Sequence, residues 1–202
     1  MKLSTPLFFI LLLFVAGQAF SQPIAEANFD VTFNDKVIGT VKATEKKEGG
    51  KIIKDLRSNT DTKVLIMSIH VESEVNATYD QETFLSGVAY RHANRGAKDI
   101  HATTTRLAAQ KYQTDKDGAK TTLQGKEVKY CVIDLYFKEP KGLKEIYSNM
   151  FATFVTVKEL APGKYMIMNP DQVNATYTYA GGKLMKIEVD TKVGKVTSVR
   201  KK

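Results

Sequence analysis

The chain has 202 residues, and 30 Lys and Arg against 22 Asp and Glu give it a formal net charge of +8. A chain of this length can bury roughly 70% of its unfolded surface, which indicates one domain with a sizeable core. Its single cysteine, Cys131, excludes an internal disulfide. The positive charge favours acidic partners, although Lys-rich strand edges that prevent aggregation would produce the same excess.

The first residues have the features of a secretory signal peptide. Lys2 precedes an apolar run over 7–16, and the small residues Ala19 and Ser21 precede Gln22. We expect cleavage between Ser21 and Gln22, with cleavage after Ala19 as the alternative. The run is shorter than the about 20 apolar residues that a membrane-spanning helix needs.

Cleavage at this place divides the chain into a signal peptide at 1–21 and a single β-rich domain at 22–202. The mature protein is then soluble and exported, to the periplasm or beyond the cell, and does not span a membrane. Because no cysteine stands at the cleavage site, the sequence also predicts that the protein is not a lipoprotein.

Alternating apolar residues predict β-strands from the start of this domain. Phe29, Val31 and Phe33 share one strand face, and 34–36 forms a short turn into a returning strand. Gly49-Gly50 makes the next turn. A weaker third strand covers 52–59 and breaks near Thr60-Asp61.

The strongest strand pattern covers 63–79. At about 3.3 Å per residue such a strand would exceed about 50 Å, so it must bend, as a curled sheet requires. The apolar face of this strand comprises Leu65, Met67, Ile69, Val71, Val75, Ala77 and Tyr79.

Two further segments extend this pattern. Phe84, Val88 and Tyr90 continue the apolar face, and Arg95-Gly96 turns the chain into a second long strand over 100–112. A shorter strand is expected over 128–132.

A helix is predicted at roughly 141–154, as a plug or lid on the sheet. Pro140 suits the first turn of a helix. Apolar residues then follow at spacings of three and four, which is typical of one helix face. They are Leu143, Ile146, Tyr147, Met150, Phe151 and Phe154.

The remaining chain returns to strands, with Gly181-Gly182 as a tight hairpin turn. The expected fold is all-β with one short helix: a curled antiparallel sheet or an open, incomplete β-barrel of about ten strands.

Four segments carry a resemblance to a known family: 37–41, 58–61, the Tyr136-Phe137-x-x-Pro140 signature, and the hairpin over 177–184. With them the chain resembles a family of uncharacterised exported proteins from Gram-negative bacteria of the Bacteroidetes group, catalogued as a domain of unknown function. The resemblance covers essentially the whole mature chain. It implies a cell-envelope location and a curled β fold, and it implies no activity.

The polar residues do not assemble into a catalytic or metal-binding motif. If Arg95-Gly96 centres a hairpin, His92 lies opposite Asp99 and His101 opposite Tyr90, but a zinc site needs three or four ligands. A buried Cys131 would be inert. Neither a nucleophile motif nor a phosphate-binding loop is present, so we expect no catalytic residue, no cofactor and no metal.

Two functions remain open. The first is a binding module for an apolar or acyl-chain ligand, with a basic rim suited to an acidic head group. The second is a structural or interaction protein of the envelope, with a filled core and an envelope protein as partner. Nucleic acid is not expected, and the oligomeric state is left open. The candidate ligand-lining residues are Leu65, Met67, Ile69, Val71, Tyr90, Tyr136, Phe137, Phe151, Tyr177 and Tyr179.

Overall fold

The computed structural model describes residues 23–64, 67–95, 98–191 and 194–202, so the predicted signal peptide and its cleavage site at Ser21 and Gln22 lie outside the described residues. Within the described ranges the chain forms fourteen β-strands and one short 3-10 helix, η1 (Val132–Tyr136). The strands are β1 (Pro23–Phe33), β2 (Lys36–Glu48), β3 (Lys51–Val64), β4 (Met67–Asp80), β5 (Thr83–Ala93), β6 (Ile100–Ala108), β7 (Lys111–Lys116), β8 (Ala119–Gln124), β9 (Glu145–Ser148), β10 (Thr153–Ala161), β11 (Lys164–Met168), β12 (Ala175–Ala180), β13 (Lys183–Thr191) and β14 (Gly194–Arg200).

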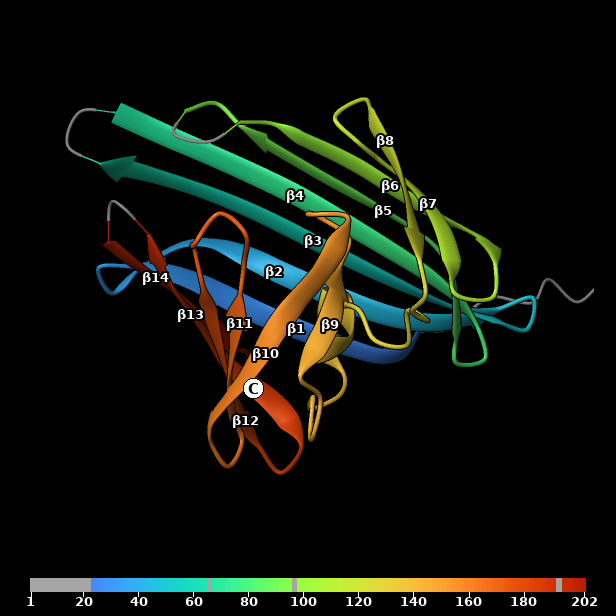
Figure 1. The fold of residues 1–202 in the computed structure, drawn as a ribbon. Helices are drawn as coiled ribbons and strands as arrows, with labels where there is room; N and C mark the ends of the chain where they lie inside the picture. The colour runs from blue at the N-terminus through green and yellow to red at the C-terminus, as the bar shows by residue number, and fades with distance from the viewer. Residues whose placement is uncertain (1–22, 65–66, 96–97, 192–193) are drawn as a thin grey trace, which may run out of the picture.

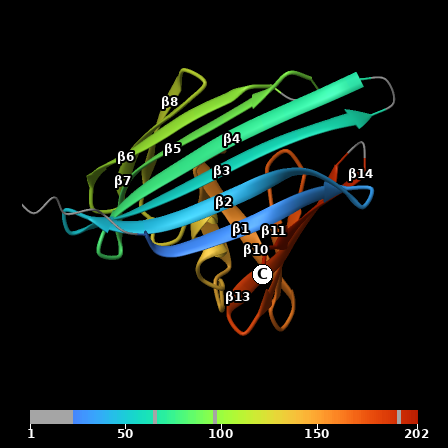
Figure 2. The same cartoon turned by 180° about the vertical axis from the view of Figure 1, so that it is seen from behind.

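All fourteen strands belong to one antiparallel sheet, which confirms the all-β prediction. Strands that follow one another in the chain are neighbours in the sheet, except for β8 and β9, and the two halves of the sheet join where β1 pairs with β14, with Val31 opposite Ser198. The edges of the sheet are β8 and β9. The sheet curls without closing: the long strands β1–β5 form one wall, and the shorter strands β9–β13 lie across from it (Figures 1 and 2).

Tight turns set the hairpin register. Asn34 and Asp35 have φ angles of 49° and 60°, and Gly181 and Gly182 have 56° and 75°. Two successive residues with positive φ match the right-handed twist of the flanking strands, which is why Asn, Asp and Gly occupy these places. The hairpins expected at these turns are confirmed.

The prediction of about ten strands was too low, because the pattern over 100–112 conceals a turn and because β8 and β9 were not expected as strands. The expected break near Thr60-Asp61 is wrong: Thr60 pairs with Val71, and Asp61 pairs with His70. The pattern over 100–112 divides into β6 and β7, with Gln110 at φ 54° in the turn. The residues around this turn keep the strand alternation, so the pattern hides the reversal.

The face assigned to β5 is also wrong, because the strand contains a β-bulge. Tyr79 pairs with Phe84 and Thr78 pairs with Ser86, so Leu85 is an extra residue in β5. One extra residue reverses the side on which all later side chains point. Ala89 is consequently buried, and Tyr90 lies on the outer face of the sheet with 37% of its surface exposed.

The helix predicted at roughly 141–154 is absent. This segment forms β9, a tight turn in which Ala152 has a φ of 52°, and the start of β10. Ile146 pairs with Val155, and Tyr147 pairs with Phe154. The spacings of three and four therefore arose from two facing strands and the turn between them.

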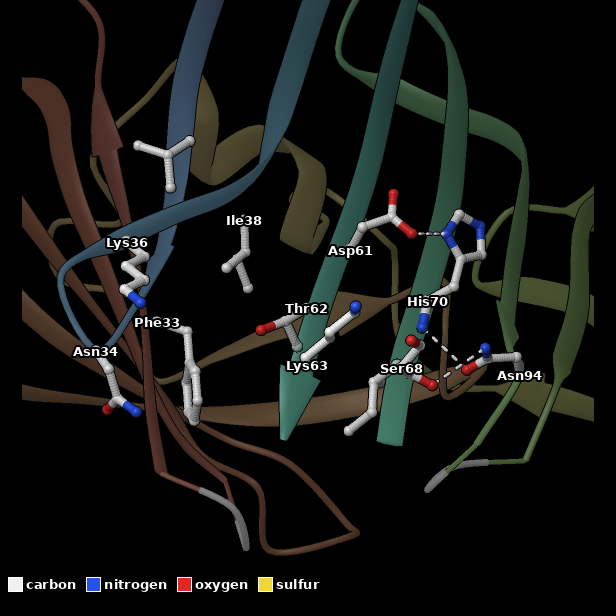
Figure 3. Close-up of a pocket in the computed structure, with 12 residues that line it drawn as sticks. Phe33, Asn34, Lys36, Ile38, Asp61, Thr62, Lys63, Ser68, His70 and Asn94 are labelled. Carbon is white, nitrogen blue, oxygen red and sulfur yellow. Dashed lines mark hydrogen bonds and ion pairs between the residues drawn. The ribbon is translucent and has the colours of Figure 1, made fainter. Parts of the chain in front are cut away.

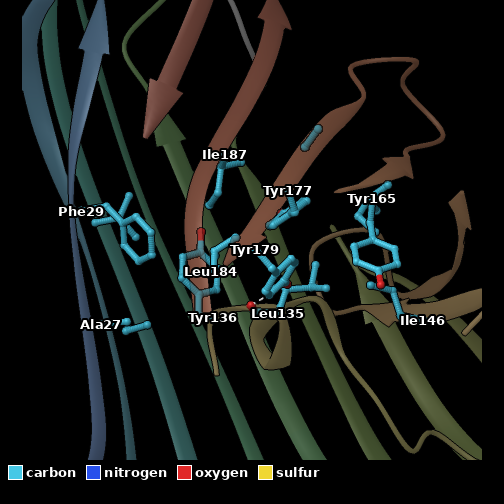
Figure 4. Packing of buried hydrophobic residues seen from close by; sticks show 14 of the residues in the cluster. Ala27, Phe29, Leu135, Tyr136, Ile146, Tyr165, Tyr177, Tyr179, Leu184 and Ile187 are labelled. Atoms are coloured by element: carbon cyan, nitrogen blue, oxygen red, sulfur yellow. Dashed lines mark hydrogen bonds between the residues drawn. The ribbon is translucent and has the colours of Figure 1, made fainter. Parts of the chain in front are cut away.

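The only helical turn among the described residues lies earlier, in the central segment, which we define as residues 125–144 between β8 and β9. Its side chains fill the interior of the curled sheet: Val128, Ile133 and Leu135 are fully buried. Tyr179 Oη donates a hydrogen bond to Leu135 O at 2.7 Å, and Tyr136 packs edge-on against Phe29 (Figure 4). The expected strand over 128–132 is reduced to one bridge, between Cys131 and Tyr147.

Candidate functional site

A buried polar cluster joins the central segment to the sheet; we define it as Glu45, Lys54, Tyr79 and Asp134. Lys54 Nζ donates to Asp134 Oδ1 at 2.6 Å and lies 2.8 Å from Glu45 Oε2. Tyr79 Oη donates to Asp134 Oδ2 at 2.7 Å. Cys131 N donates to the same oxygen at 2.6 Å, so the carboxylate also orders the start of η1.

Burial and charge in this cluster oppose proton loss. Burial acts against the charge of Lys54, but Asp134 and Glu45 outweigh it and raise the pKa of the ammonium group. Burial, with Asp134 nearby, places the pKa of Tyr79 and the pKa of the Cys131 thiol well above their usual values. A thiol that stays protonated is a poor nucleophile. The cluster therefore holds the central segment in place and has no activated nucleophile.

A second carboxylate fixes the beginning of the central segment. Glu127 accepts hydrogen bonds from Tyr112 Oη at 2.6 Å, from Arg106 Nε at 3.1 Å and from the backbone N of Gln110 at 2.8 Å. Tyr112 Oη in turn accepts a bond from Val128 N. The central segment is thus bonded to β6 and β7 near its beginning, and to β3 and β4 through Asp134 in its middle.

Beyond the central segment the two longest hairpins diverge and leave a groove of about 620 Å³. Pairing between β2 and β3 stops at Gly39 and Thr60, so residues 36–38 and 61–63 border the opening without pairing to each other. At Gly39 the strands approach closely: a Cβ there would lie 2.0 Å from Asn59 O. The separation of the hairpins is visible at the end of β3 in Figures 1 and 2.

The groove is amphiphilic. Half-buried Phe33, Ile38 and Ile69 supply apolar surface, and Lys36 and Lys63 add exposed cations. Figure 3 shows Phe33 and Ile38 of the first hairpin across from the end of β3. The ring of Phe33 lies against Gly194, where a Cβ would come within 2.8 Å of the ring, so β14 supports this wall of the groove.

The predicted ligand-lining residues fall into three groups. Ile69 lines the groove, and Val71 follows it on the same strand. Tyr136, Tyr177 and Tyr179 are buried and pack together with the partly buried Phe137 in the largest core cluster, against other side chains of the protein.

The other predicted residues lie elsewhere. Tyr90 is on the outer face, and Phe151 is half-buried in the turn between β9 and β10. Leu65 and the side chain of Met67 lie outside the described residues.

The residues expected opposite His92 and His101 are confirmed. Tyr90 pairs with His101, and His92 Nδ1 lies 3.0 Å from Asp99 Oδ1. The hydrogen bond and charge of Asp99 raise the pKa of His92, which is partly exposed. His70 makes a separate contact with Asp61 at 2.8 Å. Among the described residues, no three His, Cys, Asp or Glu side chains gather as a metal site would require.

The sequence interpretation missed Lys54, Arg91 and Asp134. Two of them had a usable signal: Lys54 lies between Ile52 and Leu56 on an inward face, and Asp134 interrupts the apolar run over 132–136. A charge within an apolar pattern indicates a buried partner, because an isolated buried charge is too costly. Arg91 could not be placed inward until the bulge in β5 was known.

Across the described ranges no helix is long and apolar enough to cross a membrane. No curated protein and no solved structure matches the chain closely enough to be reported as similar. A family model does match: the domain of unknown function DUF6134 covers residues 29–201, which is nearly the whole β-sheet domain. The chain therefore belongs to the DUF6134 family.

Proposed function

We propose that this protein is an exported, non-catalytic binding module that takes an apolar or acyl-chain ligand in the groove between its two longest hairpins. The observation that carries the proposal is the groove itself. Its volume of about 620 Å³ falls within the roughly 300–1,000 Å³ of small-molecule sites. Its apolar walls belong to two hairpins, each of which is held by its own strand pairing.

The form of the groove suits one elongated molecule. Phe33 and Ile38 belong to the β1–β2 hairpin, and Ile69 belongs to the β3–β4 hairpin, so a ligand between them would bury apolar surface on both sides. Lys36 and Lys63 at the opening would attract an acidic group to it. The signal-peptide pattern supports a ligand of the cell envelope.

A non-catalytic role is supported by the way in which the buried polar groups are used. Asp134 and Glu127 each accept several hydrogen bonds from the protein, and Cys131 is fully buried with a raised thiol pKa. These groups connect the central segment with the sheet. None of them lines the groove.

The second candidate is a structural or interaction protein of the envelope. It is favoured by the filled interior, where Ile133, Leu135 and Tyr147 are fully buried and the large tyrosines pack on the central segment. In this case the basic surface would meet an envelope protein and the groove would stay empty.

One experiment separates the two functions. The protein is purified from its natural host and extracted with organic solvent, and the extract is examined by mass spectrometry. The binding module should release a stoichiometric lipid or acyl compound, and the variant Ile38→Lys should lose it because a charge would enter the apolar wall. The control is Leu107→Lys, at an exposed position of β6 outside the groove. Clean extracts of the natural protein would contradict the proposal.

A further inference from the structure

Cations on the inner face of the sheet differ in whether they have a carboxylate partner. Lys54 lies between Glu45 and Asp134, at 2.8 Å and 2.6 Å. Arg106 lies 3.1 Å from Glu127. The interior thus neutralises both cations, as the high cost of an unpaired buried charge requires.

Arg91 is a third inward cation. It stands on β5 between Ala89 and Ala93, which are both buried, so strand alternation directs its side chain to the same inner face. Its neighbours across the sheet are Ser73 and Ile100. Tyr90, one residue earlier, points outward.

The guanidinium of Arg91 has unused hydrogen-bonding capacity. Nη2 donates to the backbone O of Lys98 at 3.2 Å, and Nε is buried without a partner. Within the described part of the chain, no carboxylate oxygen lies within 4.0 Å of it. Asp99 interacts electrostatically with Arg91, but its oxygens already accept hydrogen bonds from His92 Nδ1 and Ala93 N. An Arg can offer up to five donors to an anion in a planar arrangement.

Arg91 lies on the same face of the sheet as the groove residue Ile69. Its partner Ser73 stands four residues from Ile69 along β4, which corresponds to about 13 Å of strand. Val71 lies between them on the same face, so this face is apolar beside the groove and cationic further along the sheet. This order matches a single-chain molecule with a charged end.

We propose that Arg91 binds the anionic head group of a single-chain amphiphile whose tail lies in the groove. The inference rests on the proposed binding function and specifies its ligand class. The shared chemistry is an oxyanion, either a carboxylate or a phosphate, which the two edges of a guanidinium bind through paired hydrogen bonds. The groove supplies the affinity for the tail, and Arg91 supplies the preference for charge.

The test compares three ligands with the same tail of sixteen carbons: palmitate, hexadecyl phosphate and hexadecanol. Each is tested for displacement of the neutral dye N-phenylnaphthylamine from the purified protein, at concentrations below those at which the ligand aggregates. We expect at least one anion to bind about tenfold more tightly than the alcohol, since a charge-assisted hydrogen bond contributes at least that factor. Whichever anion is preferred identifies the source of the oxyanion.

Variants assign the preference to a residue. Arg91→Gln should remove the difference between anion and alcohol and leave the affinity for hexadecanol unchanged, whereas Arg91→Lys should keep part of it. The matched control is Arg57→Gln on the outer face, where the Arg57 side chain is 76% exposed. If Arg91→Gln fails to fold, the result with Arg91→Lys and a loss of the preference at high salt in the natural protein decide the question.

The two proposals fail in different ways. Equal affinity of the natural protein for all three ligands would overturn the role of Arg91 and leave the groove as a binding site. An undiminished anion preference in Arg91→Gln would also overturn it. No displacement by any of the three ligands would overturn the binding function itself.

Discussion

Replacement of Asp134 by Asn tests whether the polar cluster holds the central segment inside the sheet. The side chains of Asp134 and Lys54 are 6% and 13% exposed, so solvent screens their attraction only weakly. Asn keeps the size and one acceptor, but it loses the charge that Lys54, Tyr79 and Cys131 N contact at 2.6–2.7 Å.

The magnitude follows from the groups left behind. Removing one partner of a buried ion pair typically costs about 3–5 kcal/mol, because the other charge remains buried. Here Glu45 still neutralises Lys54 at 2.8 Å, so we expect the free energy of unfolding to fall by about 3 kcal/mol. For a chain of this size, that corresponds to a decrease in Tm of about 6–12 °C.

Urea unfolding followed by circular dichroism measures this change, because the chain has no Trp for fluorescence. The control is Asp190→Asn, whose side chain is 84% exposed and which should change stability by less than about 0.5 kcal/mol. Because the pKa of Lys54 is raised, its ion pair with Asp134 should also make stability depend on pH. The stabilisation by this pair is complete below pH about 10 and is lost as pH rises through the raised pKa. If Asp134→Asn matched the control, the cluster would not be what fixes the segment.

Three further predictions concern single contacts. Tyr147→Phe leaves the buried Thr104 hydroxyl without its partner at 2.7 Å, and the free energy of unfolding in urea should fall by about 1–2 kcal/mol. Adding Thr104→Val should recover part of this loss, whereas equal stability of the single variant and the natural protein would contradict the prediction. Gly87→Ala places a Cβ 2.1 Å from Asn149 Nδ2 and should destabilise the protein by about 1–3 kcal/mol. Adding Asn149→Ala should restore stability, and a lack of rescue would show that another contact is limiting. NMR titration should give His92 a pKa above 6.5 that returns towards 6.5 in Asp99→Asn. The ion pair of His92 with Asp99 stabilises the fold below pH 6.5, and this stabilisation is lost as pH rises through the raised pKa. An unchanged titration in the variant would exclude this pairing in solution.

The sequence alone determined the class of fold and most of the turns. Alternation of apolar residues depends on the period of a strand, and Asn34-Asp35 and Gly181-Gly182 depend on backbone sterics, so both are local properties. The pairing of Tyr90 with His101 and the contact of His92 with Asp99 followed from one predicted turn. These features required no knowledge of distant parts of the chain.

Tertiary structure decided the features that matter for the site. The bulge at Leu85 reverses the face of β5, so it moves Tyr90 outward and turns Arg91 inward, and no local pattern marks that one added residue. The apolar spacing over 143–154 fits a helix as well as two facing strands, and only pairing with the rest of the sheet selects the strands.

The groove arises in the same way, because β2 and β3 stop pairing at Gly39 and Thr60 while each continues in its own hairpin. Composition and alternation therefore determined that this protein is a curled β-sheet. Long-range register, which depends on how strands far apart in the chain align, decided which side chains fill its interior and which remain free to bind.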